Sequence, residues 1–291
     1  MLKSDFLKNE KYSGFIHSAF DFVEKAQLLR EDLWERFVQQ FREDADADGG
    51  WRGEYWGKMM RGACLVYQYT KNEKLYDVLR KTVSDMMASA DKTGRISSYY
   101  TNHEFEAWDM WCRKYVLLGM EYFLEICKDK KFAADIIKSI CGQLDYIIER
   151  IGHGEGKKEI TAATRHWRGL NSSSILEPVV KLYNLTGDER YFEFAKYIVD
   201  TGCVDISNIF ELAYENKFYP YQYPVTKAYE MTSCFEGLIE FYKITGDEKY
   251  KTAIVNFADR VLESDFTVTD YASAGKLWTE ESKMAVWLLT K

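Results

Sequence analysis

Six of the eight tryptophans lie in or beside polar segments that also contain arginine, glutamate or aspartate. They are Trp51, Trp56, Trp108, Trp111, Trp167 and Trp278. An indole face stacks on the C–H face of a sugar ring, while nearby carboxylates and guanidinium groups bind sugar hydroxyls. This combination favours a carbohydrate-binding site. Packing in a hydrophobic core remains the other interpretation of each tryptophan.

Charged residues accompany these tryptophans at helical spacing. Glu54 and Lys58 are four residues apart, as are Asp109 and Arg113, so each pair can share a helix face as a surface ion pair or as two ligand contacts. For His166, hydrogen bonding is favoured over catalysis. We expect substrate contacts from Trp51, Glu54, Trp56, Trp108, Asp109, Trp111, Arg113, Lys114, Arg165, His166, Trp167 and Glu230.

The residues allow hydrolytic chemistry without identifying a catalytic residue. Carboxylates that could form the paired acid and base of glycoside hydrolysis are Glu54, Glu106, Asp109, Glu177 and Glu230. The sequence contains no GxSxG, P-loop, GxGxxG or HExxH motif. These absences argue against serine-hydrolase, nucleotide-binding and zincin chemistry.

Three aspartates form a candidate metal site. Asp44, Asp46 and Asp48 are spaced like the start of an EF-hand loop, but the twelfth position, which needs a bidentate glutamate, is Tyr55. An aspartate-rich turn is therefore the simpler interpretation, and a Ca²⁺ site of another geometry is the alternative. The residues predict no other cofactor.

The elements that must position these residues follow from an internal repeat. The segment YNLTGDERY (183–191) recurs as YKITGDEKY (242–250), and weaker copies start at Tyr67 and Phe123. The anchor positions 70, 127, 186 and 245 are 57, 59 and 59 residues apart. Apolar residues at helical spacing flank each anchor, glycine fits a helix end and aspartate fits the next N-cap. Each copy thus predicts a helical hairpin with a tight turn.

Longer return segments join consecutive hairpins, at residues 44–54, 89–107, 152–170, 203–225 and 264–280. In antiparallel hairpins all returns lie at one end, which gathers the aromatic and charged residues there. We predict an all-α fold of the α/α-toroid class, built from hairpins of about 58 residues that form either a complete or an incomplete ring; an open solenoid is the alternative. We expect one domain over 1–291, with N-terminal helices in 1–44, four hairpins in 45–263, and a return with a partial last helix in 264–291.

Composition excludes several classes of partner. The net charge of −7 and the pI of about 5.4 argue against nucleic acid and anionic membranes. No apolar stretch reaches the roughly 20 residues of a membrane span, and the N-terminus has no apolar signal-peptide core. The six cysteines are scattered and form no CxxC pair. This pattern favours buried structural thiols and a location in the reducing cytoplasm. The expected ligand is an oligosaccharide or a small glycoside. A second copy of the chain and a completing domain are the protein partners that stay open.

Six motifs occur in an order that resembles the helical catalytic domain of the bacterial β-L-arabinofuranosidase glycoside hydrolase family. They are GEYWGK (53–58), GRISSY (94–99), WDMWCRKY (108–115), GLN (169–171), LEP (176–178) and TVTDYASAG (267–275). The resemblance covers about residues 45–280. It implies an α/α-barrel that acts on plant-derived, arabinose-containing glycans. It also implies a retaining mechanism with a zinc-bound cysteine nucleophile and a glutamate acid/base.

The chain departs from this family at the catalytic positions. Lys276 stands where the acid/base glutamate is expected, and Arg113 stands where a histidine is common. We expect the Glu-Thr-Cys region, which supplies the nucleophile and zinc thiolates, to follow Lys291, because six units of about 58 residues would need roughly 350 residues. Cys234 is not assigned as the nucleophile, and no zinc ligand is assigned in this chain.

Three functions are therefore open: a glycoside hydrolase acting on plant oligosaccharides, an unsaturated-uronide hydrolase type with an aspartate acid/base, and a non-catalytic sugar-binding or scaffold protein. The sequence favours the first.

Overall fold

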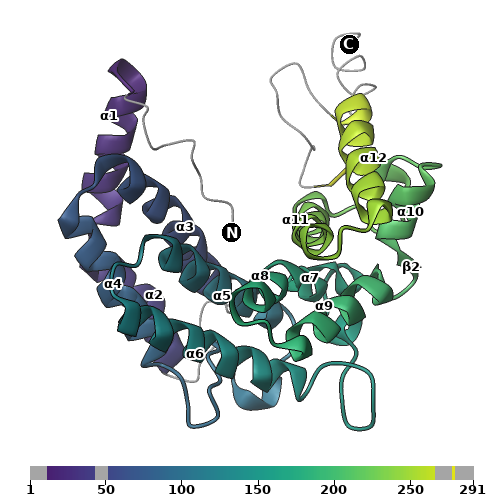
Figure 1. The fold of residues 1–291 in the computed structure, drawn as a ribbon, viewed down its shortest axis with the longest axis horizontal. Helices are drawn as coiled ribbons and strands as arrows, with labels where there is room; N and C mark the ends of the chain where they lie inside the picture. Colours follow the sequence, from purple (N-terminus) through teal and green to yellow (C-terminus); the bar gives the residue numbers. More distant parts are fainter. Residues whose placement is uncertain (1–11, 43–51, 266–276, 279–291) are drawn as a thin grey trace. The chain divides into compact units, whose positions relative to one another are not determined.

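A computed structural model describes residues 12–42, 52–265 and 277–278. These residues divide into two compact units, residues 1–149 and 150–291, which are described separately. Both units are almost wholly helical (Figure 1). None of the described helices combines the length and the apolar character needed to cross a bilayer. The prediction of a single domain over 1–291 stays a prediction.

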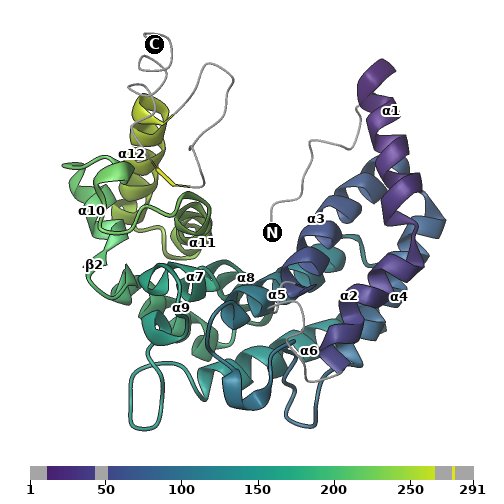
Figure 2. The ribbon, with the colours of Figure 1, turned by 180° about the vertical axis from the view of Figure 1, so that it is seen from behind.

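The described part of the first unit is mostly helical, with a long return between residues 87 and 109. Its elements are α1 (Gly14–Val23), the π-helix η2 (Glu24–Leu28), α2 (Glu31–Arg42), α3 (Arg52–Thr70), α4 (Glu73–Met87), the 3₁₀ turn η3 (Thr101–His103), α5 (Asp109–Ile126) and α6 (Lys130–Ile148). Helices α3 and α4 form one hairpin, and α5 and α6 form the next (Figure 2). Its core contains Trp34, Trp56, Leu75, Leu79 and Phe123.

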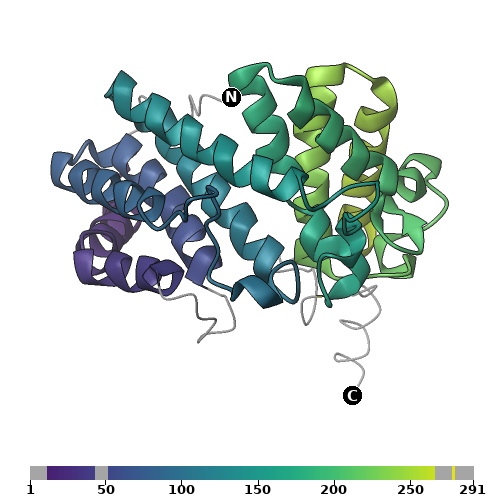
Figure 3. The same cartoon turned by 90° about the horizontal axis from the view of Figure 1, so that it is seen from below.

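The second unit, coloured from green to yellow in Figure 3, again contains helical hairpins. Its helices are η4 (Ile160–Ala162), η5 (Trp167–Gly169), α7 (Leu170–Ser173), α8 (Leu176–Thr186), α9 (Glu189–Thr201), α10 (Ile209–Glu215), η6 (Pro220–Gln222), α11 (Ala228–Thr245) and α12 (Glu248–Ser264). Strands β1 (Cys203–Val204) and β2 (Ser207–Asn208) pair antiparallel in register Cys203↔Asn208 and Val204↔Ser207. Helix α10 packs on α12.

The tight turns have the chemistry that the repeat predicts. Gly187 and Gly246 end α8 and α11 in the left-handed conformation, with φ of 68° and 67°. The Asp188 and Asp247 carboxylates then accept hydrogen bonds from the second backbone N–H of α9 and α12, at 3.0 and 2.9 Å. These two predicted helix stops and two predicted N-caps are confirmed.

Candidate functional site

Helices α3 and α5 of the first unit approach each other closely because glycines face the neighbouring helix. A Cβ at Gly53 would lie 2.8 Å from the Cys112 carbonyl oxygen, and one at Gly57 would overlap the Tyr115 carbonyl. A Cβ at Gly119 would lie 2.5 Å from the Trp56 ring. The two helices therefore bring the motifs at 53–58 and 108–115 into contact.

This close approach gathers an aromatic cluster, defined as Trp108, Trp111 and Tyr115 with the cations of Lys58 and Lys114. The ring centroid of Trp111 lies 6.3 Å from the ring centroid of Trp108 and 5.1 Å from that of Tyr115. The Lys58 Nζ lies 5.3 Å from the Tyr115 ring, and the Lys114 Nζ lies 4.9 Å from the Trp111 ring. Cations over ring faces hold the rings in place. Trp108 is half-buried, whereas Trp111 and Lys114 are each 1% exposed.

Two more predicted contacts of this unit occupy different environments. The Glu54 carboxylate is ion-paired with Lys58 at 2.6 Å, and the side chains are 10% and 39% exposed. Trp56 is wholly buried, and its indole N–H donates to Thr82 at 2.9 Å. Glu54 thus lies at the edge of the aromatic cluster, and Trp56 lies in the core beneath it.

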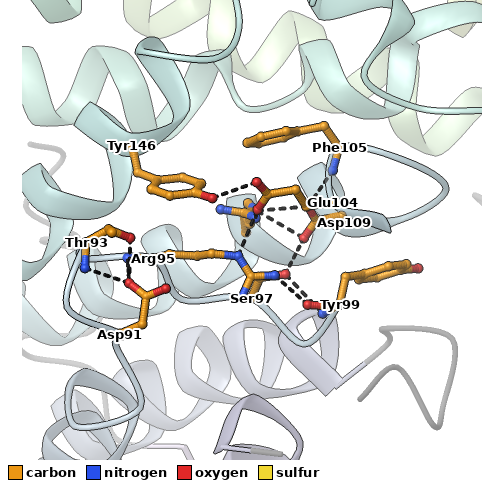
Figure 4. Close-up of polar contacts among 10 residues, drawn as sticks. Asp91, Thr93, Arg95, Ser97, Tyr99, Glu104, Phe105, Asp109 and Tyr146 are labelled. Carbon is orange, nitrogen blue, oxygen red and sulfur yellow. Dashed lines mark hydrogen bonds and ion pairs between the residues drawn. The ribbon is translucent and has the colours of Figure 1, made fainter. Parts of the chain in front are cut away.

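Asp109 and Arg113 form a buried ion pair one helical turn apart (Figure 4). The Arg113 Nε lies 3.0 Å from both Asp109 carboxylate oxygens. Asp109 also accepts hydrogen bonds from the Ser97 hydroxyl at 2.6 Å and from the Phe105 N–H at 2.8 Å. The Asp109 and Arg113 side chains are 0% and 2% exposed, so almost no atom of either reaches the surface.

Glu104 extends this network and was missed by sequence reasoning. Its carboxylate accepts from Arg95 Nε at 2.8 Å, from Arg113 Nη2 at 2.8 Å and from the Tyr146 hydroxyl at 2.6 Å (Figure 4). Glu104 and Arg95 come from the return between α4 and α5, and Tyr146 comes from α6. In the sequence, Glu104 looks like an ordinary polar loop residue, so only the structure shows its role.

In the second unit, Trp167 projects from a strained stretch of backbone. Trp167, Arg168 and Gly169 have φ of 55°, 53° and 109°, all in the left-handed region. Non-glycine residues there cost of order 1–3 kcal/mol each and persist only when surrounding contacts hold them. Arg168 supplies such a contact through two hydrogen bonds to Asp205, at 2.7 and 3.1 Å. The result is an indole that is 38% exposed in η5, directly before α7.

Helix α11 places charged groups beside this indole. The Lys227 Nζ lies 5.5 Å from the Trp167 ring centroid and 3.3 Å from the Glu230 carboxylate. The Glu230 and Lys227 side chains are 2% and 9% exposed. Trp167, Lys227 and Glu230 are named here the indole–carboxylate cluster. The structure thus brings together Trp167 and Glu230, which are 63 residues apart in the sequence.

Asn171 is a second residue that sequence reasoning did not select. Its side chain is wholly buried, and neither the amide nitrogen nor the amide oxygen has a hydrogen-bond partner among the described residues. A buried amide without a partner is costly and is rare in proteins. Asn171 belongs to the GLN motif at 169–171, so the motif was the available signal.

Arg165 and His166 lie just before this strained stretch. Burial and the neighbouring Arg165 cation lower the pKa of His166 below 6.5. His166 is therefore mostly neutral at pH 7, and its backbone N–H donates to the Thr164 hydroxyl at 3.0 Å.

The lowered pKa of His166 predicts a pH dependence of stability. Because the unfolded state binds the proton more readily, the free energy of unfolding is expected to fall as the pH drops through 6.5 toward the folded pKa. An NMR titration of the imidazole should give a midpoint below 6.5, and Arg165→Gln should raise it only in part, since burial is the larger cause. A midpoint at or above 6.5 in the native chain would contradict this assignment.

Five further positions that the sequence singled out lie outside the described residues. These are Trp51, Asp44, Asp46, Asp48 and Lys276.

The zinc that the family resemblance implies does not fit the side chains in 12–42, 52–265 and 277–278. No group of three or more His, Cys, Asp or Glu in these ranges could hold a metal ion. Burial raises the pKa of the Cys112 thiol well above its usual value, which favours a protonated thiol over a metal-binding thiolate. The Cys234 thiol lies 3.5 Å from the Leu170 carbonyl, in a position to donate to it. No catalytic step is therefore assigned to zinc on these residues.

Comparisons with solved structures identify the fold. The chain is similar to the GH127 β-arabinofuranosidase BT3674, with 16% identity over 89% of this chain and 41% of that chain, and a TM-score of 0.59. It is similar to a GH127 β-L-arabinofuranosidase from Geobacillus stearothermophilus T6, with 15% identity over 92% and 47% of the two chains and a TM-score of 0.64. A GH76 α-mannanase from Bacteroides thetaiotaomicron matches with 13% identity over 78% and 61%, and a TM-score of 0.51.

The chain thus spans less than half the length of these two GH127 proteins. The prediction of an all-α fold of the α/α-toroid class is confirmed by the helical hairpins and by this likeness. No curated protein matches the sequence significantly. A family model described as the β-L-arabinofuranosidase GH127 catalytic domain matches residues 7–288. The chain therefore belongs to the β-L-arabinofuranosidase family GH127, as the sequence motifs indicated.

Proposed function

We propose that this protein recognises arabinose-containing oligosaccharides of plant origin and that it acts on them as a glycoside hydrolase of the GH127 type. The indole–carboxylate cluster carries this proposal. Trp167 offers an exposed ring, while Lys227, which is 9% exposed, places a cation next to it, and the buried Glu230 carboxylate holds that cation in place. A flat apolar face beside charged hydrogen-bonding groups is the pattern that sugar rings require.

Backbone strain at the exposed Trp167 and next to the half-buried Trp108 supports the same proposal. The backbone of Trp167 is in the left-handed conformation, and Ala107, directly before Trp108, has a φ of 42°. Strained non-glycine residues concentrate at binding and active sites, where the fold holds them in place. Each position lies where a return leads into a helix of its own unit, and the sequence predicts ligand contacts in such returns.

A non-catalytic sugar-binding role is the second candidate, and one observation favours it. The described carboxylates of the predicted contacts are all ion-paired: Glu54 with Lys58, Asp109 with Arg113, and Glu230 with Lys227. This arrangement suits binding and positioning. The uronide-hydrolase alternative required Asp109 to reach substrate, and the full burial of Asp109 argues against it.

A panel of synthetic pentosides and hexosides separates these roles. We expect the whole protein to release arabinose from an arabinofuranoside faster than any hexose from its glycoside. Binding without turnover across the panel would favour the non-catalytic role, and neither binding nor turnover would refute both. A cytoplasmic location, a second copy of the chain and a completing domain remain predictions.

Trp167→Ala is expected to weaken oligosaccharide binding about ten-fold, equivalent to about 1.4 kcal/mol, because it removes the exposed indole face. Calorimetric titration with an arabinose-containing oligosaccharide measures this loss. The midpoint of urea unfolding should stay nearly unchanged. Leu185→Ala is the matched control, because Leu185 is also 38% exposed but lies at the tight-turn end of α8. Equal affinities of the two variants would refute the role of Trp167.

A further inference from the structure

We propose that Asp109 and Glu104 are positioning residues for substrate binding: through Arg95 and Arg113 they fix the turn that presents Trp108. This inference rests on the proposed function, in that Trp108 is taken to be part of the sugar-binding surface. None of the four charged residues needs to touch the sugar. Their side chains are 12% exposed or less.

The turn in question is residues 104–108, between η3 and α5, and its backbone is strained. Phe105 and Ala107 have φ of 55° and 42°, although both carry a Cβ. Each such residue costs of order 1–3 kcal/mol, so the turn needs an external constraint to keep this conformation. Trp108 is the last residue of the turn and the residue before α5.

The network supplies that constraint at both ends of the turn. At its start, Glu104 accepts from both guanidinium groups, at 2.8 Å each. In its middle, the Phe105 N–H donates to Asp109 at 2.8 Å. At its end, the Trp108 N–H donates to the Tyr99 hydroxyl at 3.2 Å.

The same groups also hold the return that precedes the turn. Ser97 donates to Asp109 at 2.6 Å and accepts from the Tyr99 N–H at 3.0 Å. Arg95 donates through Nη2 to the Tyr99 carbonyl at 2.5 Å. The return and the turn are thus connected through one set of buried bonds (Figure 4).

The charges of the network balance. Two carboxylates and two guanidinium groups cancel, so their burial leaves no net charge in the interior. Charge-assisted hydrogen bonds are shorter and more directional than neutral ones, which suits fixing a geometry. A helix N-terminus needs only one acceptor as a cap, whereas Asp109 and Glu104 together accept from the side chains of four residues and one backbone N–H.

The test uses the whole protein and the mild variant Ser97→Ala, which removes the bond that Ser97 donates to Asp109 and the one that it accepts from the Tyr99 N–H, and creates no unpaired charge. Asp109→Asn is the strong variant, because the amide nitrogen of the new asparagine would face groups that all donate hydrogen bonds to Asp109. Glu73→Gln is the control: Glu73 pairs with Lys128 on the exposed tight-turn side of the same unit. Two quantities are measured below the unfolding temperature: the affinity for the oligosaccharide and the near-ultraviolet circular dichroism signal of Trp108. The Trp108 signal is the difference between the spectra of the native protein and of the Trp108→Phe variant.

We expect Ser97→Ala to weaken affinity about three- to ten-fold and to reduce the Trp108 signal while helix content stays native, with Glu73→Gln unchanged in both. Native affinity and a native Trp108 signal in a folded Ser97→Ala variant would overturn the positioning role. If the native protein binds no sugar, the proposed function fails separately, and the Trp108 signal alone decides whether the network positions the indole. If Asp109→Asn does not fold, Ser97→Ala still gives the answer.

Discussion

Replacing Arg113 with methionine is expected to lower the free energy of unfolding by about 3–5 kcal/mol, because two buried carboxylates lose a cation at once. Arg113 donates to Asp109 at 3.0 Å and to Glu104 at 2.8 Å while only 2% exposed. Methionine has a similar length, so the loss of charge and hydrogen bonds dominates over the loss of volume. Urea unfolding followed by circular dichroism measures the change.

Arg36→Met is the matched control for this prediction. Arg36 lies 3.9 Å from Asp32 with both side chains at least 60% exposed, so its removal should change stability by less than about 0.5 kcal/mol. The double variant Asp109→Asn with Arg113→Met should recover part of the loss, since it leaves fewer buried charges unpaired. An Arg113→Met midpoint equal to that of Arg36→Met would show that the network contributes nothing to stability.

The hairpins could be predicted from the sequence because their information is local. In three of the turns a threonine hydroxyl accepts from the backbone N–H two residues later: Thr70 at 3.3 Å, Thr186 at 3.2 Å and Thr245 at 3.4 Å. A tyrosine hydroxyl also donates to the glutamate six residues later in the same three turns. All of these contacts lie within nine consecutive residues, so they appear in the sequence as a repeated motif.

The site could be predicted only in part, because its contacts are not local. The pairing of Asp109 with Arg113 follows from helical spacing, but their burial depends on Glu104 and Arg95 in the preceding return and on Tyr146 in α6. The approach of Lys227 and Glu230 to Trp167 depends on how α11 packs in the second unit. No periodicity encodes such contacts. The sequence selected Asp109, Arg113, Trp167 and Glu230 but not Glu104 or Lys227, and only the structure separated surface residues from buried ones.

Gly57→Ala is expected to cost about 3 kcal/mol or more, because the new methyl group would meet backbone rather than a movable side chain. Its Cβ would overlap the Tyr115 carbonyl, and that carbonyl belongs to the regular hydrogen bonding of α5. Relief requires α3 and α5 to separate, which would also move Trp111 and Tyr115 away from Lys58. The variant should therefore lose sugar affinity together with stability.

Gly62→Ala makes this prediction specific to the helix contact. Gly62 lies five residues further along the same helix, and nothing lies within 4 Å of a Cβ placed there. Alanine has a higher helix propensity than glycine, so this change should stabilise the protein by about 0.5–1 kcal/mol. Opposite signs for the same chemical substitution in one helix can arise only from what each glycine faces. If both variants instead shifted the urea midpoint in the same direction, the close packing of α3 on α5 would be refuted, and with it the arrangement of the aromatic cluster.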